Sequence, residues 1–347
     1  MKQKSPFVFS LVRKSCISGS LLSLGWVFYI LMSQASFASQ PIKLPSSLVP
    51  VEFYSNQTSD DLTALFVTAI GQAKESVNLG IYSLTDPEII EALNNKGAEN
   101  IPVHIACDAK ASPGITAKLK NVHLVRCAGN GLMHQKILII DEKTALLGSA
   151  NFTPSSLQSH GNLVVGIDHS ALASALAKRT KSMNEEKMVT YPLLHSEIKA
   201  GEQTIELCVL PDDCKAPERI LSLLQSAKKT IKVAMFTWTR IDFTKELIAA
   251  FKRGVQVEAV VDRYCAKGAN AKVIKMLQKS GIPIRLHQGP GLLHHKLAYI
   301  DDEILIHGSA NWTKNAFELN DDFFIVAHSL TEEQKKKMDL LWKTVYK

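Results

Sequence analysis

The sequence lacks the residue clusters that usually bind metals, and its composition is not biased toward any residue type. Each of these absences excludes a class of protein. It has six cysteines in 347 residues, and no CxxC pair or Cys/His cluster suggests a zinc site. No carboxylate cluster suited to magnesium or calcium is visible. With 46% apolar and 21% charged residues, the composition is globular rather than collagen-like or disordered. We therefore expect a folded protein that uses no metal or other cofactor.

Strong net charge is also missing. The formal charge is +7, but the first 38 residues hold four basic side chains and no acidic one, so the remainder carries only +3. Bulk charge therefore gives little reason to expect nucleic acid as the partner. A basic run between Lys252 and Lys279 is expected to be mostly a solvated face, although it could meet a phosphate backbone or an anionic membrane surface.

The first 38 residues have the layout of an export signal. A basic start is followed by an apolar run from about Ile17 to Met32 and by small residues at Ser36 and Ala38. Cleavage after Ala38 would give a secreted, periplasmic or envelope-associated protein. The alternative is an uncleaved membrane anchor, but the apolar run is short for a span of about 20 residues.

Five cysteines lie beyond this signal, and an exported protein can form disulfides. Cys208 and Cys214 are close enough in sequence to close a short loop, and Cys107 and Cys127 each end an expected strand. The alternative is that all five are reduced and packed as small apolar residues. The sequence leaves the pairing open.

The chain is organised around a motif that occurs twice. The first copy runs from His134 to Asn151 and the second from His294 to Asn311, and both read H-x-K-x4-D-x6-G-S-x-N. Upstream, the two halves also align over a long stretch without a gap. Such a repeat predicts a tandem duplication. We expect a signal at 1–38, a first half at 39–183, a connector at 184–201 and a second half at 202–347.

Within each half, strand-like and helix-like patterns alternate. The expected strands include 51–54, 77–82, 103–107, 134–140, 204–210, 231–236 and 257–261. The expected helices include 60–74, 87–96, 216–228, 243–253 and a closing helix at 331–347. This alternation predicts an α/β fold with two mixed, mostly parallel sheets flanked by helices.

The histidine and lysine of each motif are the expected catalytic groups. Side chains two apart on a strand share a face, so His134 and Lys136 point the same way, as do His294 and Lys296. Two histidines flanking one phosphorus atom suggest that one attacks and forms a phospho-histidine, while the other protonates the leaving alcohol and then activates water. The lysines supply positive charge, so we expect a metal-independent mechanism.

The GSxN residues are the expected substrate-binding groups. A hydroxyl and an amide at each turn, together with the lysines, would bind a phosphate or its transition state. These residues are Ser149, Asn151, Ser309 and Asn311. Strand-end aromatics could also touch the substrate, although core packing is their commoner role: Phe236, Trp238 and Trp312.

The remaining motif residues have expected structural roles. Asp141 and Asp301 lie an odd number of positions from their histidines and should face away, satisfying turn or hairpin amides. Gly148 and Gly308 should let the backbone turn tightly.

The doubled motif resembles the signature of the phospholipase D superfamily. The likeness spans nearly all of the chain after the signal, and residues 290–296 and 308–313 are similar to the small bacterial endonucleases and mitochondrial cardiolipin hydrolases of that superfamily. Those proteins carry one motif per chain and dimerise, whereas this chain carries both. The resemblance implies a tandem-duplicated phospholipase D-like fold and a monomer with a pseudo-dimeric active site on a pseudo-twofold axis. It also implies His134 as the nucleophile and His294 as the general acid.

One position departs from that family's pattern. Members commonly carry a Glu or Asp that orients a catalytic imidazole, and the second half has Asp322 there, shortly after Asn320. The first half has Asn162, after His160. A carboxylate would raise the basicity of only one histidine, and the sequence leaves open which one Asp322 serves. The asymmetry fits unequal roles or reduced activity.

Three functions are compatible with these residues. The first is an exported phospholipase D that frees a headgroup from a glycerophospholipid, with phosphatidyl transfer to another alcohol, as in cardiolipin synthesis, as a close chemical variant. The second is an endonuclease, and the third is a weakened, non-catalytic binding protein. Export and modest charge favour a phospholipid substrate, while small size and the nuclease-like resemblance favour nucleic acid. We expect the phospholipid.

Overall fold

The structure is a computed structural model that describes residues 42–185 and 195–347. The expected export signal lies outside the described residues. Across both described ranges, we find no helix whose length and apolar character would let it cross a membrane.

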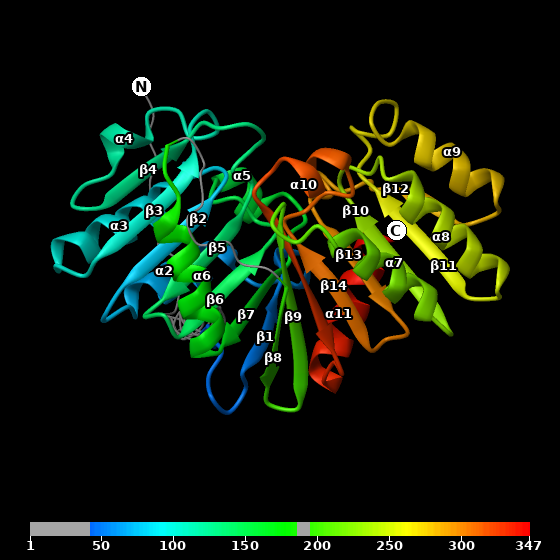
Figure 1. Cartoon of the computed structure of the whole chain (residues 1–347), viewed down its shortest axis with the longest axis horizontal. Helices are drawn as coiled ribbons and strands as arrows, with labels where there is room; N and C mark the ends of the chain where they lie inside the picture. The colour runs from blue at the N-terminus through cyan, green and yellow to red at the C-terminus, as the bar shows by residue number, and fades with distance from the viewer. Residues whose placement is uncertain (1–41, 186–194) are drawn as a thin grey trace, which may run out of the picture. The chain divides into compact units, whose positions relative to one another are not determined.

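The first half folds around a seven-stranded sheet (Figure 1). Its strands, in spatial order, are β1 (Val51–Tyr54), β7 (Val164–Asp168), β6 (Thr144–Gly148), β5 (Lys136–Ile140), β2 (Val77–Ile81), β3 (Val103–Asp108) and β4 (His123–Cys127). Every residue of β2 and β5 is buried, as expected for apolar strands covered on both faces.

The second half repeats this order in an eight-stranded sheet. Its strands are β8 (Ser196–Ala200), β9 (Gln203–Leu210), β15 (Asp322–His328), β14 (Ile304–Gly308), β13 (Lys296–Ile300), β10 (Thr230–Met235), β11 (Gln256–Val261) and β12 (Ile284–Leu286). The extra strand β8 lies inside the range assigned to the connector. The rest matches the first sheet strand for strand, so the expected duplicated fold is confirmed.

Both sheets are mixed, but neighbouring strands are mostly antiparallel rather than mostly parallel. Among the described strands, parallel pairing is confined to β2–β3–β4 and β10–β11–β12. The motif segments instead return as hairpins, β5–β6 and β13–β14, and tight turns impose antiparallel pairing. The expectation of largely parallel sheets is wrong for this reason.

Helices flank the sheets. Those of the first half are η1 (Asn56–Thr58), α2 (Leu62–Gly71), α3 (Pro87–Ala98), α4 (Ile115–Lys118), α5 (Pro154–Gln158) and α6 (Ser170–Ser182). Those of the second half are α7 (Ala216–Ser226), α8 (Ile241–Lys252), α9 (Ala271–Lys279), α10 (Lys314–Glu318) and α11 (Glu332–Val345). Side chains cap the N-termini of several helices. Asp61 accepts a hydrogen bond from Ala64 N at the start of α2, and Asp86 accepts one from Glu88 N at the start of α3, whose first residue is a proline.

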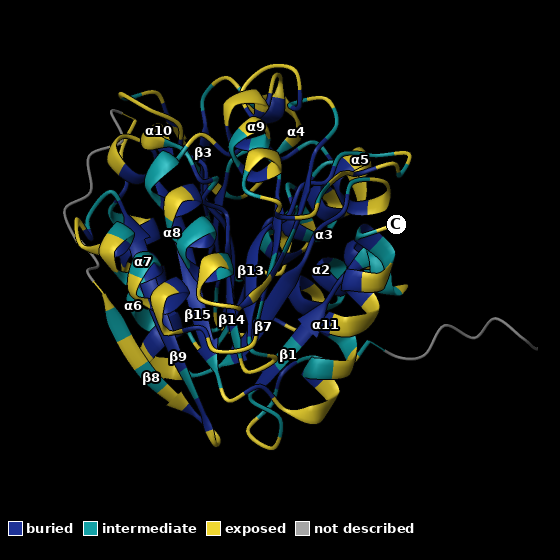
Figure 2. Ribbon diagram, turned by 90° about the vertical axis from the view of Figure 1, so that its right-hand side faces the viewer, coloured by how far each residue is buried: buried dark blue, intermediate teal, exposed yellow. Residues whose placement is uncertain are grey.

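One apolar core lies between the two sheets. It contains Ile137 and Leu147 from the first half together with Leu207 and Leu297 from the second. Figure 2 shows the buried central strands and the exposed outer faces of the helices. Because both halves contribute to this core, their relative position is fixed, and side chains of one half contact residues of the other.

The structure also answers the question of disulfides. Cys107, Cys208, Cys214 and Cys265 are free thiols. Neither of the two possible pairings is therefore formed.

Candidate active site

The segments before β5 and β13 cross from one half to the other through isolated bridges. The backbone N–H of His134 donates to Asp321 O at 2.8 Å, and that of His294 donates to Gly161 O at 3.0 Å. Each motif histidine is thus attached by its backbone to the opposite half. For this reason β5 and β13 begin at the lysines, two residues after the histidines.

A carboxylate at the end of β3 or β11 holds each of these segments. Asp108 Oδ2 accepts from Met133 N at 3.3 Å, and Asp262 Oδ2 accepts from Leu293 N at 2.9 Å. In sequence these two acids stand out only as matching positions of the repeat. Their role is to fix the backbone next to the histidines.

Asp322 serves the histidine of the other half. His134 Nδ1 lies 2.7 Å from Asp322 Oδ1, and both side chains are buried. Ser309 Oγ donates to the same oxygen at 2.7 Å, and Asn320 Nδ2 donates to Oδ2 at 3.3 Å. Burial raises the pKa of Asp322, but His134 and Lys136 outweigh it and hold that pKa below its ordinary range. An ionised Asp322 accepts a hydrogen bond from Nδ1–H of His134, which leaves Nε2 free to react.

Asn162 takes the same place beside the second histidine. His294 Nδ1 lies 3.0 Å from Asn162 Oδ1, and Ser149 Oγ donates to that oxygen at 2.8 Å. Asn162 Nδ2 donates to Ser156 O at 2.7 Å, which fixes the orientation of the amide. The two histidines therefore have equivalent positions, but the partner of His134 is a charged carboxylate and the partner of His294 is a neutral amide.

The GSxN serines support these orienting residues. Ser149 and Ser309 are fully buried, and each hydroxyl also accepts a backbone N–H, from Leu163 at 3.2 Å or Phe323 at 3.1 Å. Each serine hydroxyl thus already donates one hydrogen bond and accepts another inside the protein. This geometry disfavours the predicted direct contact between the serines and the substrate, which stays a prediction.

The GSxN asparagines lie just after β6 and β14. Asn311 Oδ1 accepts from Thr237 N at 3.3 Å. Asn151 Oδ1 is buried without a hydrogen-bond partner among the described residues. Buried polar atoms of this kind are commonly satisfied by a water or a ligand, so substrate binding by Asn151 stays a prediction.

The two motif lysines are buried beside the histidines. Lys136 Nζ donates to His134 O at 2.5 Å, and Lys296 Nζ donates to His294 O at 2.7 Å. Burial lowers the pKa of Lys136 to about 7, although Asp322 opposes this. Burial lowers the pKa of Lys296 well below its ordinary value, and Lys136 adds to the effect. Both lysines therefore need an anion nearby to stay charged.

Burial also lowers the pKa of both histidines. For His134, the carboxylate of Asp322 opposes this lowering. For His294 the pKa falls well below its ordinary value, because Lys296 and Lys136 act in the same direction as burial. The protonated form of His294 is therefore less stable than that of His134.

An aromatic ring flanks each histidine. The Tyr82 ring lies 5.1 Å from that of His134 and 5.0 Å from Lys136 Nζ. Phe236 stands in the same way 5.1 Å from His294. Phe236 was among the expected substrate contacts but Tyr82 was missed, although the repeat aligns these two positions. In contrast, Trp238 and Trp312 pack edge to face in the core, with ring centroids 4.9 Å apart.

The motif aspartates lie away from the histidines. Asp141 accepts from the N–H groups of residues 74–76 at 2.8 to 3.1 Å, and Asp301 accepts from those of residues 228–230 at 2.7 to 2.8 Å. Burial raises the pKa of Asp301, but the three amides outweigh it and leave the pKa below its ordinary value. Their role is to tie the hairpin turns to the starts of β2 and β10.

The motif glycines permit a close approach of two strands. A methyl group on Gly148 would lie 2.2 Å from Leu163 O, and one on Gly308 would lie 2.3 Å from Phe323 O. Neither glycine has a positive φ. The expected reason, a tight turn, is therefore wrong, and the actual one is the lack of space for a side chain.

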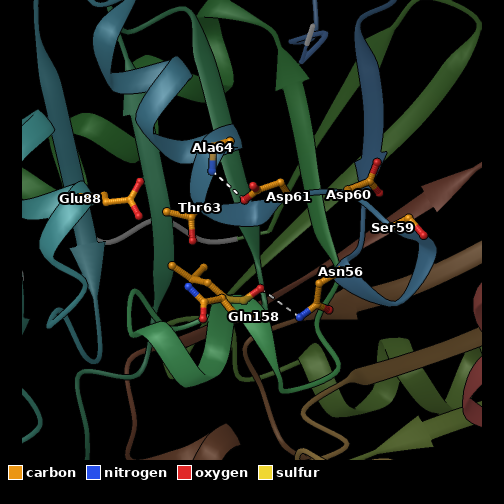
Figure 3. Close-up of a pocket in the computed structure, with 9 residues that line it drawn as sticks. Asn56, Ser59, Asp60, Asp61, Thr63, Ala64, Glu88 and Gln158 are labelled. Atoms are coloured by element: carbon orange, nitrogen blue, oxygen red, sulfur yellow. Dashed lines mark hydrogen bonds between the residues drawn. The ribbon is translucent and has the colours of Figure 1, made fainter. Parts of the chain in front are cut away.

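A cavity of about 460 Å³ opens elsewhere on the first half (Figure 3). It is lined by Asn56, Ser59, Asp60, Asp61, Thr63, Ala64, Glu88, Leu157 and Gln158. Its three carboxylates would repel an anionic substrate, and none of the motif residues lines it. This cavity is not the catalytic site.

Comparisons with known proteins agree with this picture. A family model described as "Cardiolipin synthase, PLD-like domain" matches residues 66–184 and again residues 220–342. The mitochondrial cardiolipin hydrolase of Xenopus laevis is 29% identical over 168 residues, which is 48% of this chain and 79% of that protein. A phospholipase D of Rickettsia conorii is 28% identical over 118 residues, 33% of this chain and 59% of that protein. Over several vertebrate cardiolipin hydrolases, the match covers from 44% to 79% of their length.

The whole fold has a counterpart among solved structures. The phosphatidylserine synthase of Haemophilus influenzae superposes with a TM-score of 0.65 over 91% of this chain and 90% of that one, at 12% identity. An identity this low speaks for the fold alone. Because the family model matches once in each half and covers well over half of the residues, the chain belongs to the family of cardiolipin synthase, PLD-like domains within the phospholipase D superfamily.

Proposed function

We propose that this protein is an exported, metal-independent phosphodiesterase that hydrolyses phospholipid headgroups through a phospho-histidine. The observation that carries the proposal is the pairing of His134 with a buried carboxylate while His294 has a neutral amide. Two such histidines, each beside a lysine, are what a two-step displacement at phosphorus requires.

The partners of the histidines support a division of roles. When Nε2 of His134 attacks phosphorus, its ring gains positive charge, which the Asp322 carboxylate 2.7 Å away stabilises. His294 has no such charge on its Nδ1 side, so its protonated form gives up a proton readily to the leaving alcohol. The same nitrogen then takes a proton from the water that attacks the phospho-histidine. His134 is thus the nucleophile and His294 the general acid and base.

The lysines would hold the phosphoryl oxygens. An arriving phosphodiester supplies the anion that favours the protonated forms of Lys136 and Lys296, and the low dielectric of the buried site strengthens the attraction between these lysines and the phosphoryl oxygens. The two lysines therefore stabilise the negative charge of the phosphoryl group, as metal ions do in other phosphodiesterases.

The choice of a phospholipid rests on the names of relatives. The matched proteins include cardiolipin hydrolases and a phospholipase D. Export rests on the layout of the first 38 residues. The Asn162 amide contacts His294 Nδ1 at the position where Asp322 contacts His134, so His294 is still oriented. A weakened binding protein is therefore the less favoured alternative.

Purified protein with chelator present would be given vesicles of phosphatidylcholine or cardiolipin, and single-stranded DNA in parallel. We expect release of a phospholipid headgroup, abolished in His134→Asn and His294→Asn but retained in His123→Asn, which changes an exposed histidine of β4. Strand cleavage without lipid turnover would make the protein an endonuclease. Labelled phosphate trapped on His294 instead of His134 would reverse the assigned roles.

A further inference from the structure

A second cluster of reactive side chains lies outside the catalytic centre. It joins His195, just before β8, to Cys208 on β9 and to Asp213 in the turn between β9 and α7. One ligand atom from each of the three lies within 4.8 Å of the other two. This cluster is not visible in the sequence, because its members are spread over separate elements.

We propose that His195, Cys208 and Asp213 bind a zinc-like divalent transition metal ion. Zinc bonds of about 2.0–2.3 Å at tetrahedral angles put ligand atoms roughly 3.3–3.7 Å apart. His195 Nδ1 lies 3.3 Å from Cys208 Sγ and 3.8 Å from Asp213 Oδ2. The two distances from His195 Nδ1 are thus close to tetrahedral spacing, the third is within 4.8 Å, and an ion held by these three ligands would keep a fourth position open.

The surroundings of His195 support a ligand role. Its other ring nitrogen, Nε2, lies 3.5 Å from Glu206 Oε2. Glu206 is in turn held by Arg219 Nε at 2.7 Å and by His328. A carboxylate behind the far nitrogen of a ligating histidine is the usual arrangement that orients the ring toward a metal.

Neither nucleophilic catalysis nor core packing accounts for the cluster as well. Cys208 is fully buried, so it cannot act as a nucleophile on a substrate in a Cys–His–acid triad. Simple core packing explains a buried thiol, but not an imidazole and a carboxylate turned toward it. A cation with a thiolate and a carboxylate as ligands explains all three.

The described part of the first half has no counterpart of this cluster. In the repeat, Tyr54 and Ser59 stand where the second half has Cys208 and Asp213. The Tyr54 hydroxyl donates instead to Lys43 O at 2.6 Å. The ligand set is therefore a feature of one half and not a remnant of the duplicated fold.

A metal here would stabilise a turn that contacts the other half. The ion would tie His195, next to the start of β8, to the turn that carries Asp213. The preceding residue in that turn, Asp212, pairs with the buried Arg179, which also donates to Asp321 at 3.0 Å. Because Asp321 precedes the orienting Asp322, metal loading is expected to stabilise the fold around the catalytic site.

The test is metal binding by the full chain after treatment with a chelator. We expect one equivalent of Zn²⁺ to bind and to raise the melting temperature, with Cys208→Ser and His195→Ala weakening binding by about 100-fold or more. The matched control is Cys214→Ser, which changes an exposed cysteine six residues on and should bind as the unaltered chain does. Loss of binding in Cys214→Ser, or unchanged binding in Cys208→Ser, would overturn the proposal.

Should Cys208→Ser fail to fold, Co²⁺ in the unaltered chain gives the answer. A thiolate-to-cobalt charge-transfer band with strong visible bands would report tetrahedral ligation by a cysteine, and their absence would refute it. This result is independent of the phosphodiesterase activity, which the catalytic proposal expects to survive chelation.

Discussion

The Asp322 carboxylate lies 2.7 Å from Nδ1 of His134, a residue 188 positions away in the other half of the chain. The reciprocal contact, from His294 to Asn162, spans 132 positions. Each catalytic histidine is therefore completed by a residue of the opposite half. Neither catalytic histidine has its Nδ1 partner in its own half among the described residues, so the active site depends on the packing of the two sheets.

This pairing predicts that Asp322→Asn acts on the chemical step. Without the carboxylate, the charge that develops on His134 loses its stabilisation, and we expect kcat to fall by roughly 10² to 10⁴-fold with little change in KM. Steady-state kinetics on phospholipid vesicles would measure this. A variant with kcat near that of the unaltered enzyme would show that Asp322 is not needed to orient His134.

Asn162→Asp is the reciprocal variant. A carboxylate beside His294 would raise the pKa of its imidazole, so its protonated form would persist to higher pH but donate its proton less readily. We expect the alkaline limb of the pH–rate profile to move upward while kcat at the optimum falls. An unshifted profile would exclude His294 as the general acid.

The buried lysines predict that anion binding takes up protons. Since the pKa of Lys136 is lowered to about 7, this side chain is mostly neutral at about pH 8 in the free enzyme. A bound phosphate stabilises the charged form, so protons are taken from the buffer, and affinity falls as pH rises above 7. Calorimetry with inorganic phosphate, in buffers of different ionisation enthalpy, would show this as a buffer-dependent heat.

Lys136→Met provides the comparison for that experiment. It removes one titrating group and should reduce the number of protons taken up, in addition to weakening phosphate binding. If the heat of binding to the unaltered protein is the same in every buffer, the lysines are already charged in the free enzyme.

The sequence predicted the duplication, the family and most of the strands, because these depend on local periodicity and on a repeat that is visible by itself. In the structure the charges of His134, Lys136, His294 and Lys296 lie close enough to shift one another's pKa, which places the four side chains around one region. Which histidine Asp322 serves could not be predicted, because the choice depends on how two sheets pack across a shared core. The same packing decided the role of the serines, which turn toward the orienting residues.

Two misjudged features have a simple physical origin. The sheets contain more antiparallel pairs than expected because the hairpin after each motif histidine lies in the middle of its sheet. Each hairpin also pairs antiparallel with its other neighbour, β2 or β10, and the sequence pattern does not show that pairing. Tyr82 was missed because tyrosine is common in strand-like segments, so its presence in one does not mark a site. Aligning it with Phe236 through the repeat would have been the signal that found it.

The motif aspartate predicts a loss of stability without a loss of chemistry. In Asp301→Asn, one acceptor oxygen becomes an NH₂ group that faces the N–H of Lys228 or of its neighbours. We expect the free energy of unfolding to fall by about 1–3 kcal/mol, with kcat nearly unchanged. Denaturant titration and steady-state kinetics would be read on the same preparation.

Asp302→Asn is the matched control for that variant. Asp302 also has a positive φ and the same charge, but its carboxylate makes an exposed pair with Lys232 at 3.2 Å. Such a pair contributes at most about 1 kcal/mol. Equal losses in both variants would mean that charge, and not the three amide hydrogen bonds, stabilises the turn.

The close approach of β14 and β15 predicts that Gly308 tolerates no side chain. In Gly308→Ala the methyl group would lie 2.3 Å from Phe323 O and 2.6 Å from Phe324 Cα, so the strands must separate. We expect a loss of about 1–3 kcal/mol or more in the free energy of unfolding. Activity should fall as well, because Ser309, the next residue, donates to Asp322 and would move with the strand.

Gly71→Ala tests whether this cost comes from lack of space. Gly71 ends α2 with no atom within 4 Å of the added methyl, so the same substitution should leave stability unchanged or raise it by up to about 1 kcal/mol. Melting temperatures and kcat of the two variants would be compared under one condition. If Gly308→Ala unfolds at the same temperature as the unaltered chain and retains its kcat, the strands can move apart without disturbing the serine, and the link between the motif glycine and the orienting carboxylate is wrong.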